Sequence, residues 1–152
     1  MKENFSLLGF DKVRAKLRLV KDEIRGKATR SALRRASGIL VRAAKENVME
    51  LDDPETGRRI ADNIQLQFGS KVYAQTGKHL YRIGVGTRWQ GIAKGNPDTG
   101  PRGNTPHWHL LEYGTRRSRE KSFMRKALRS NVNPVINRFE NELNRELDKA
   151  LK

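Results

Sequence analysis

The chain has 152 residues, of which 36% are hydrophobic and 32% charged, and its formal charge is +15 at pH 7. This length predicts a single domain over residues 1–152 with a modest hydrophobic core. The chain has no cysteine, which excludes disulfides and thiolate metal sites, and no run of about 18 apolar residues, which argues against a membrane-spanning helix.

The positive charge is concentrated in two segments. Residues 1–46 hold 13 basic and 5 acidic side chains, and residues 88–129 hold 10 and 3, whereas residues 47–87 and 130–152 are balanced. Such clustering favours an anionic partner, either nucleic acid or an acidic protein surface. The alternative is a solvated basic face that binds nothing.

Two helices are predicted in the N-terminal third of the chain. The first begins near Gly9, with Asp11 as its N-cap, and ends at Gly26, because apolar residues recur between them at helical spacing. The second covers residues 28–48 and has an alanine-rich apolar stripe. The opposite face of this second helix is basic and carries Arg30, Arg34, Arg35 and Arg42.

A small sheet is predicted in the middle of the chain. Residues 60–64 favour a short helical turn, and the alternation over 64–68 then predicts a strand. A second strand is predicted over 72–75, and clean alternation predicts another over 80–85. The apolar and aromatic run at 107–113 is predicted to be the last strand.

Residues 87–106 are predicted to form a flexible arm. Five glycines and three prolines fall between Gly86 and Pro106, and loops of this length are usually functional or mobile. Trp89 has little core to join there, so we predict that it anchors the arm in a groove of a neighbouring subunit. The alternative is an insertion without a function.

A long helix is predicted from about Ser122 to the C-terminus, kinked or divided at Pro134. Gly114 ends the preceding strand and is expected to adopt a backbone conformation that a side chain would strain. The candidate contacts to a partner or DNA near the start of this helix are Arg116, Arg117, Arg119, Lys121 and Arg125. The predicted fold class is α+β, a small, mostly antiparallel sheet flanked by two N-terminal helices and one C-terminal helix, with a long flexible loop.

No pattern in the sequence predicts catalysis. His107 and His109 share a face of the predicted strand, but zinc sites need three or four ligands. The serines lack a Gly-x-Ser-x-Gly context, and no glycine-rich segment is followed by the Lys-Ser/Thr and helix of a phosphate-binding loop. We therefore expect no enzymatic activity, no metal and no cofactor.

Several short motifs resemble the tail-component family of lambda-like siphophages, which comprises neck, tail-completion and head–tail joining proteins. The more specific ones are Glu112-Tyr-Gly-Thr115 and Phe123-Met-Arg-Lys-Ala-Leu128, and the opening Gly9-Phe-Asp11 and the strand at 81–86 are also similar. Ser122 stands where that family usually has proline. The positions that match the two specific motifs are Glu112, Tyr113, Gly114, Thr115, Phe123, Ala127 and Leu128.

The resemblance implies a structural virion protein that completes the tail and joins it to the head as a ring, with six copies by analogy with tail tubes. It implies that residues 112–115 form a strand-to-helix corner, and that Phe123, Ala127 and Leu128 pack the last helix over the sheet. The implied partners are other copies of the chain, the tail tube, the tail terminator or head–tail connector proteins, and genomic DNA in the channel. The implied location is the tail or neck of the virion, after assembly in the host cytoplasm. A non-specific DNA-binding accessory protein is the alternative function.

Overall fold

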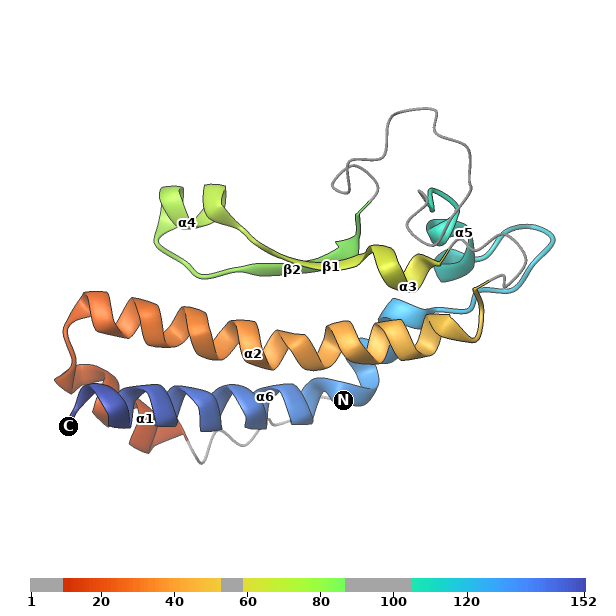
Figure 1. Ribbon diagram of the computed structural model, residues 1–152. Helices are drawn as coiled ribbons and strands as arrows, with labels where there is room; N and C mark the ends of the chain where they lie inside the picture. The colour runs from red at the N-terminus through yellow and green to blue at the C-terminus, as the bar shows by residue number, and fades with distance from the viewer. Residues whose placement is uncertain (1–9, 53–58, 87–104) are drawn as a thin grey trace. The chain divides into compact units, whose positions relative to one another are not determined.

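A computed structural model describes residues 10–52, 59–86 and 105–152, and Figure 1 shows its helices and strands. In chain order they are α1 (Phe10–Leu19), α2 (Asp22–Met49), α3 (Ile60–Asn63), β1 (Ile64–Phe68), α4 (Ser70–Thr76), β2 (Tyr81–Val85), α5 (Trp108–Tyr113) and α6 (Phe123–Ala150). The two strands form an antiparallel sheet, and the predicted α+β class with helices towards both ends of the chain is confirmed. The predicted arm, apart from its last two residues, and Trp89 lie outside the described residues.

The chain divides into two compact units, residues 1–36 with 133–152, and residues 37–132. We call them the helical unit and the hairpin unit. Both α2 and α6 contribute residues to each unit. The single domain over 1–152 stays a prediction.

The core of the helical unit joins α1 to parts of α2 and α6. Its buried side chains are Val13, Val20, Ala28, Ala32, Leu143 and Leu147. Ala32 and Ala36 are fully buried, as the alanine-rich stripe in the sequence predicts. An ion pair of 2.6 Å between Lys16 and Asp148 also connects α1 with α6.

The boundary between the first two helices differs from the prediction. The break lies at Val20 and Lys21, and α2 continues through Gly26, so the predicted end at Gly26 is wrong. Val20 is buried, and its carbonyl accepts a hydrogen bond of 3.3 Å from the Arg25 side chain. This carbonyl at the break between the two helices therefore has a hydrogen-bond partner. Asp22 and the residue after it place negative charge in the first turn of α2, where the helix dipole favours it. Asp11 lies within the first turn of α1 and not at its N-cap.

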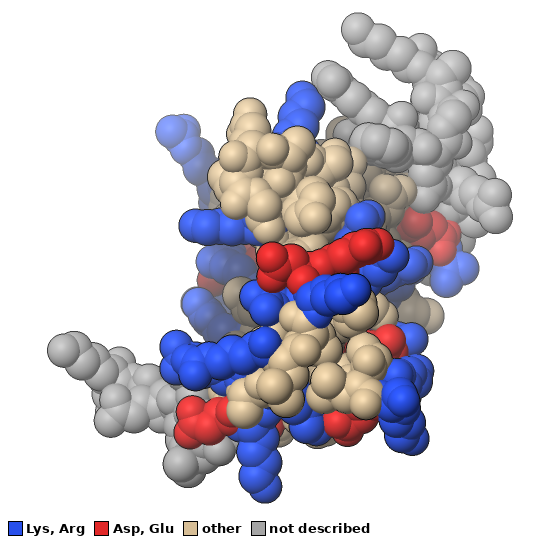
Figure 2. Space-filling view, turned by 90° about the vertical axis from the view of Figure 1, so that its left-hand side faces the viewer, with Lys and Arg blue, Asp and Glu red and all other residues tan. Residues whose placement is uncertain are grey.

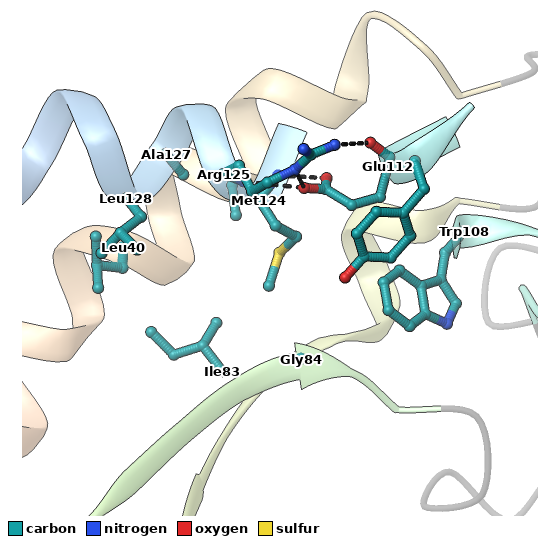
Figure 3. Close-up of a pocket in the computed structure, with 11 residues that line it drawn as sticks. Leu40, Ile83, Gly84, Trp108, Glu112, Met124, Arg125, Ala127 and Leu128 are labelled. Carbon is teal, nitrogen blue, oxygen red and sulfur yellow. Dashed lines mark hydrogen bonds and ion pairs between the residues drawn. The ribbon is translucent and has the colours of Figure 1, made fainter. Parts of the chain in front are cut away.

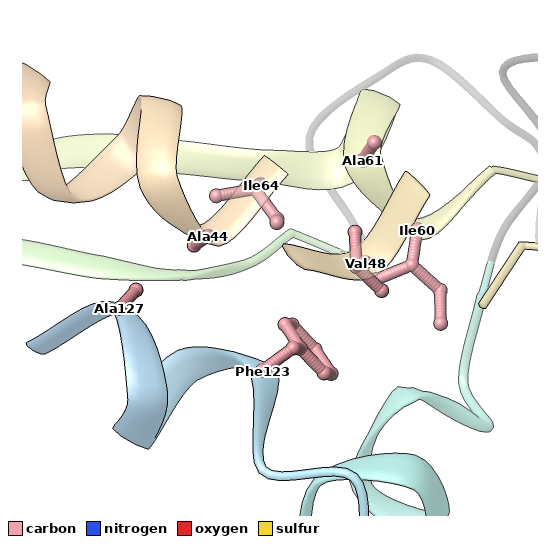
Figure 4. Packing of buried hydrophobic residues seen from close by; sticks show 7 residues of the cluster. All are labelled: Ala44, Val48, Ile60, Ala61, Ile64, Phe123 and Ala127. Atoms are coloured by element: carbon pink, nitrogen blue, oxygen red, sulfur yellow. The ribbon is translucent and has the colours of Figure 1, made fainter. Parts of the chain in front are cut away.

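The hairpin unit is built around β1 and β2. Ile64 pairs with Val85 and Phe68 pairs with Tyr81, which fixes the register of the sheet. The short helical turn at α3 and both strands lie where the sequence predicts them. Figure 4 shows the buried cluster that joins this hairpin to the helices, formed by Ala44, Val48, Ile60, Ala61, Ile64, Phe123 and Ala127.

The predicted strand at 72–75 is wrong, because this segment belongs to α4. None of the residues of α4 is buried, so no sheet neighbour selects an extended conformation there. The helix ends at Gly77, whose φ is +68° and whose N–H donates to the Tyr73 carbonyl over 2.8 Å. Glycine in this left-handed conformation is a common helix end, and it is the signal for a helix in this segment.

The predicted last strand at 107–113 is also wrong, because residues 108–113 form α5. Trp108 and Leu111, three residues apart, pack against the core, whereas Leu110 and Tyr113 are exposed. That is the periodicity of a helix and not of a strand. The implied strand-to-helix corner is therefore a helix-to-helix corner, and this segment provides no sheet edge for docking.

The division of the last helix near Pro134 is confirmed. Asn131 has φ −124° and ψ 15°, which interrupts α6 three residues before the proline. Proline lacks an N–H for the carbonyl of residue 130, and its ring crowds the same turn. The Asn131 side chain donates a hydrogen bond of 2.8 Å to the Ala127 carbonyl, so the carbonyl before the kink has a partner.

Candidate functional site

A pocket of about 310 Å³ opens beside the start of α6 in the hairpin unit. Figure 3 shows the side chains of α2, β2, α5 and α6 that line it. The apolar part of its lining consists of Leu40, Ile83, Trp108, Met124, Ala127 and Leu128. The charged residues that line it are Glu112 and Arg125, and both belong to the corner between α5 and α6.

Glu112 fixes α5 to the start of α6. Its side chain is 2% exposed, and its carboxylate accepts hydrogen bonds from the backbone N–H of Met124 at 2.8 Å and of Arg125 at 3.1 Å. These are the second and third residues of α6, whose N–H groups have no partner within the helix. An N-cap side chain usually fills this role, but here it comes from the preceding helix.

Arg125 completes this network from the other side. Its Nε donates to the Glu112 carboxylate over 3.0 Å, and one Nη donates to the Glu112 carbonyl over 2.6 Å. The same Nη donates to Glu120 over 2.8 Å, which lowers the pKa of that carboxyl. The guanidinium also lies over the ring of Tyr113, 5.2 Å from its centroid. Arg125, predicted as a partner contact, is thus used within the corner.

Gly114 allows the chain to turn after α5. Its φ is +77° and its ψ is 178°, a region almost restricted to glycine. A Cβ at this position would lie 2.7 Å from the backbone nitrogen of Glu120 and 3.0 Å from the carbonyl oxygen of Ser118. The sequence-based expectation of a special backbone conformation at Gly114 therefore agrees with the geometry.

Thr115 organises the loop that follows. Its N–H donates to the Ser118 carbonyl over 2.8 Å, and its Oγ1 accepts from the backbone N–H of Arg117 at 3.2 Å and of Ser118 at 3.1 Å. At the other end, the N–H of Lys121 donates to the Leu111 carbonyl over 2.7 Å. Residues 114–121, which we call the corner loop, are therefore held by backbone hydrogen bonds.

The second motif contributes both to the core and to the pocket. Phe123 and Ala127 are buried, whereas Leu128 is 54% exposed and lines the pocket. Leu128, implied together with the other two to pack the last helix over the sheet, lines the pocket with Ile83 of β2. Tyr113, from the first motif, is 65% exposed beside the same pocket. Exposed apolar side chains of both motifs thus lie around one concave surface.

The end of the hairpin that carries α4 is a second surface with exposed apolar side chains, part of the tan area at the top of Figure 2, and the exposed Lys71 and Lys78 belong to the same end. Tyr73 and Leu80 are exposed there. The Tyr73 ring lies 4.9 Å from the His79 ring and 5.7 Å from the Phe68 ring, measured between centroids. We call this surface the hairpin tip.

The basic candidates differ in how they are paired. Among the residues that the structure describes, no acidic side chain forms an ion pair with the exposed corner-loop residues Arg116, Arg117, Arg119 and Lys121. On α2, Arg30, Arg34, Arg35 and Arg42 are exposed as predicted. However, Arg35 is bound by Glu142 and Glu146 at 2.6 and 3.1 Å.

Two residues of the site have functions that the sequence analysis missed. Glu112 was matched only as part of a motif, and its capping role gave no local signal because the N–H groups that it binds lie 12 and 13 positions further along the chain. Leu40 belongs to the apolar stripe of the second predicted helix, but its distance from α5 in the sequence hides its place in the pocket. No three His, Asp or Glu side chains of the described segments gather as a metal site would require, and no helix in those segments is long and apolar enough to cross a membrane.

A family model described as "Bacteriophage HK97-gp10, putative tail-component" matches residues 11–114, which is more than half of the chain. No curated protein and no solved structure matches the chain.

Proposed function

The chain belongs to the HK97-gp10-like family of bacteriophage tail components, and on this premise we propose that it completes the tail and joins it to the head as a homo-oligomeric ring in the neck. Its partners are then the tail tube, the tail terminator or head–tail connector proteins. It is assembled in the host cytoplasm and remains in the virion. Such a role depends on binding and not on turnover, so it needs neither a catalytic group nor a cofactor.

The apolar pocket between the two family motifs carries this proposal. Tyr113 and Leu128 are exposed beside a pocket whose lining is mostly apolar, and their burial against another chain is favourable. Exposed apolar patches bordered by charged residues often mark protein interaction sites. The corner that places both residues is held by Glu112, so the contact surface is formed before a partner binds.

We propose the hairpin tip of a second copy as the occupant of this pocket. Tyr73 and Leu80 are exposed at the end of the hairpin, and no residue of α4 is buried within the chain. The hairpin tip therefore has apolar surface that another copy can cover. The pocket and the tip are different surfaces of the same chain, so a contact between them is heterologous. Repeated heterologous contacts form a closed ring when the rotation between copies closes. Six copies are proposed by analogy with tail tubes.

The mass of the purified protein at high salt tests this proposal. Wild-type protein is expected to be oligomeric, and Leu128→Glu is expected to shift it to smaller species because a charge enters the apolar contact. Leu19→Glu is the matched control, since Leu19 is 74% exposed on α1 and lines none of the described pockets. A wild-type protein that remains monomeric, even with its tail and head partners, contradicts the proposal.

A mixing experiment tests the pairing of pocket and tip. Leu128→Glu disables the pocket and leaves the tip intact, whereas Tyr73→Glu does the opposite. Each variant alone is expected to be monomeric, and an equimolar mixture is expected to form heterodimers joined by the one intact contact. A mixture that stays monomeric, or a Tyr73→Glu variant that still forms rings, excludes the tip as the occupant. Electron microscopy of particles then locates the ring at the neck.

A further inference from the structure

We propose that the corner loop binds the phosphate backbone of double-stranded DNA without sequence preference. This inference goes beyond the proposed function, because it concerns another surface and holds whether or not the protein forms a ring.

The charge of the corner loop is not cancelled within the described part of the chain. Its exposed basic side chains have no ion-pair partner there, and its one acidic residue, Glu120, is hydrogen-bonded to Arg125. Arg129, exposed on α6, is close enough to lower the pKa of Glu120, so the basic surface continues onto that helix. The basic residues of the loop itself are Arg116, Arg117, Arg119 and Lys121.

The backbone of the corner loop is ordered before any ligand arrives. The hydrogen bonds of Thr115 to residues 117 and 118, and of Lys121 to Leu111, fix both of its ends. None of these bonds uses an arginine side chain. A fixed backbone loses less conformational entropy on binding, so its guanidinium groups are presented at lower cost than on a flexible tail.

The composition of the loop favours phosphate over an acidic protein surface. Residues 114–121 contain no apolar side chain, whereas the centre of a protein interface is apolar and poor in charged residues. Contacts to DNA phosphates come from arginine, lysine, hydroxyl groups and backbone N–H groups, and arginine binds phosphate in a bidentate manner. The loop offers all of these groups.

The same composition favours duplex DNA without sequence preference. Binding of single-stranded nucleic acid uses aromatic rings on which bases stack, and residues 114–121 have none. Reading base edges in the major groove requires an element that enters the groove, such as a helix or a two-stranded ribbon. An eight-residue loop that is rich in arginine contacts the backbone instead.

The experiment measures affinity for a short mixed-sequence duplex between about 50 and 200 mM salt. In the loop variant, Arg116, Arg117 and Arg119 are all changed to Gln. If each arginine neutralises one phosphate, the slope of log K against log salt is expected to fall in magnitude by about 2.7. Changing the same three residues to Lys is expected to restore most of the slope, because the charges remain.

A second triple variant controls for net charge. Lys12→Gln, Arg18→Gln and Arg34→Gln remove the same charge from exposed positions on α1 and α2 that have no described ion-pair partner. This control is expected to keep the wild-type slope. An equal loss in both triple variants overturns the assignment to the corner loop, as does an unchanged slope in the loop variant.

Polyglutamate distinguishes an acidic protein from DNA. If polyglutamate of matched charge competes as well as duplex DNA, or if the loop variant fails to assemble while its DNA affinity is unchanged, the loop is a protein-docking surface and the inference is wrong. Leu128→Glu separates this inference from the proposed ring, because it is expected to impair assembly without changing the salt slope per protein chain.

Discussion

Two almost completely buried glutamates, Glu112 in the hairpin unit and Glu142 in the helical unit, are stabilised by different kinds of partner. Glu112 accepts hydrogen bonds from two backbone N–H groups as well as from Arg125. Glu142, 4% exposed, is bound at 2.6 to 2.8 Å by three arginine side chains, Arg35, Arg138 and Arg145. Arginine side chains can turn to water when their partner is lost, but the N–H groups at a helix start cannot.

This difference indicates which of the two units depends on individual residues. In the helical unit, Glu142 has three arginine partners, so the loss of one of them leaves the other two. In the hairpin unit, Glu112 and Gly114 each have a role that no neighbour can take over. The corner between α5 and α6 therefore depends on particular residues.

The largest effect is expected for Gly114→Val. The backbone conformation alone costs a non-glycine residue about 1 to 3 kcal/mol, and the added atoms collide with the backbone of residues 118–120. We expect a loss of at least about 3 kcal/mol in the free energy of unfolding, or failure to fold. Chemical denaturation measures this loss.

Gly38→Ala is the control for this substitution. Gly38 lies within α2, and a Cβ there would have no neighbour within 4 Å. We expect a gain of about 0.5 to 1 kcal/mol, as for other helix-interior glycines. If Gly114→Val is tolerated as well as Gly38→Ala, the corner does not require glycine.

A smaller effect is expected for Glu112→Ala. It removes the acceptor of two N–H groups at a buried helix start, and we expect a loss of about 2 to 3 kcal/mol. Hydrogen exchange at the amides of Met124 and Arg125 should become faster than at other core amides. Glu120→Ala is the matched control, because this carboxylate binds the same Arg125 but is exposed, and its removal should change neither measurement appreciably. Unchanged exchange in Glu112→Ala contradicts the capping role.

The smallest effect is expected for Glu142→Gln, and it depends on pH. The hydrogen bond from Arg35 lowers the pKa of Glu142 below its usual value of 4.5. The stabilisation from this carboxylate is therefore complete well above pH 4.5 and is lost as the pH falls through the lowered pKa. Urea titrations at neutral and acidic pH should show that the difference between wild type and Glu142→Gln decreases at acidic pH. A difference that is constant or grows on acidification contradicts the ion pair.

The sequence by itself determined the elements with enough local signal. The alternation at 64–68 and 81–85, the alanine-rich stripe of α2, the interruption near Pro134 and the need for glycine at position 114 all follow from periodicity or from the chemistry of one residue type. These signals act within a few residues of each other, so they do not depend on what packs against the segment.

The tertiary structure decided the short segments and the pocket. A segment of six or seven residues can be read as a strand or as a helix, and α5 is helical because Trp108 and Leu111 meet the core three residues apart. Likewise, the partners of Glu112, the internal use of Arg125 and the exposure of Leu128 follow from the way α5 meets α6. The hydrogen bonds of Glu112 with Met124 and Arg125 join residues more than ten positions apart, and only the packing of the chain brings these residues together.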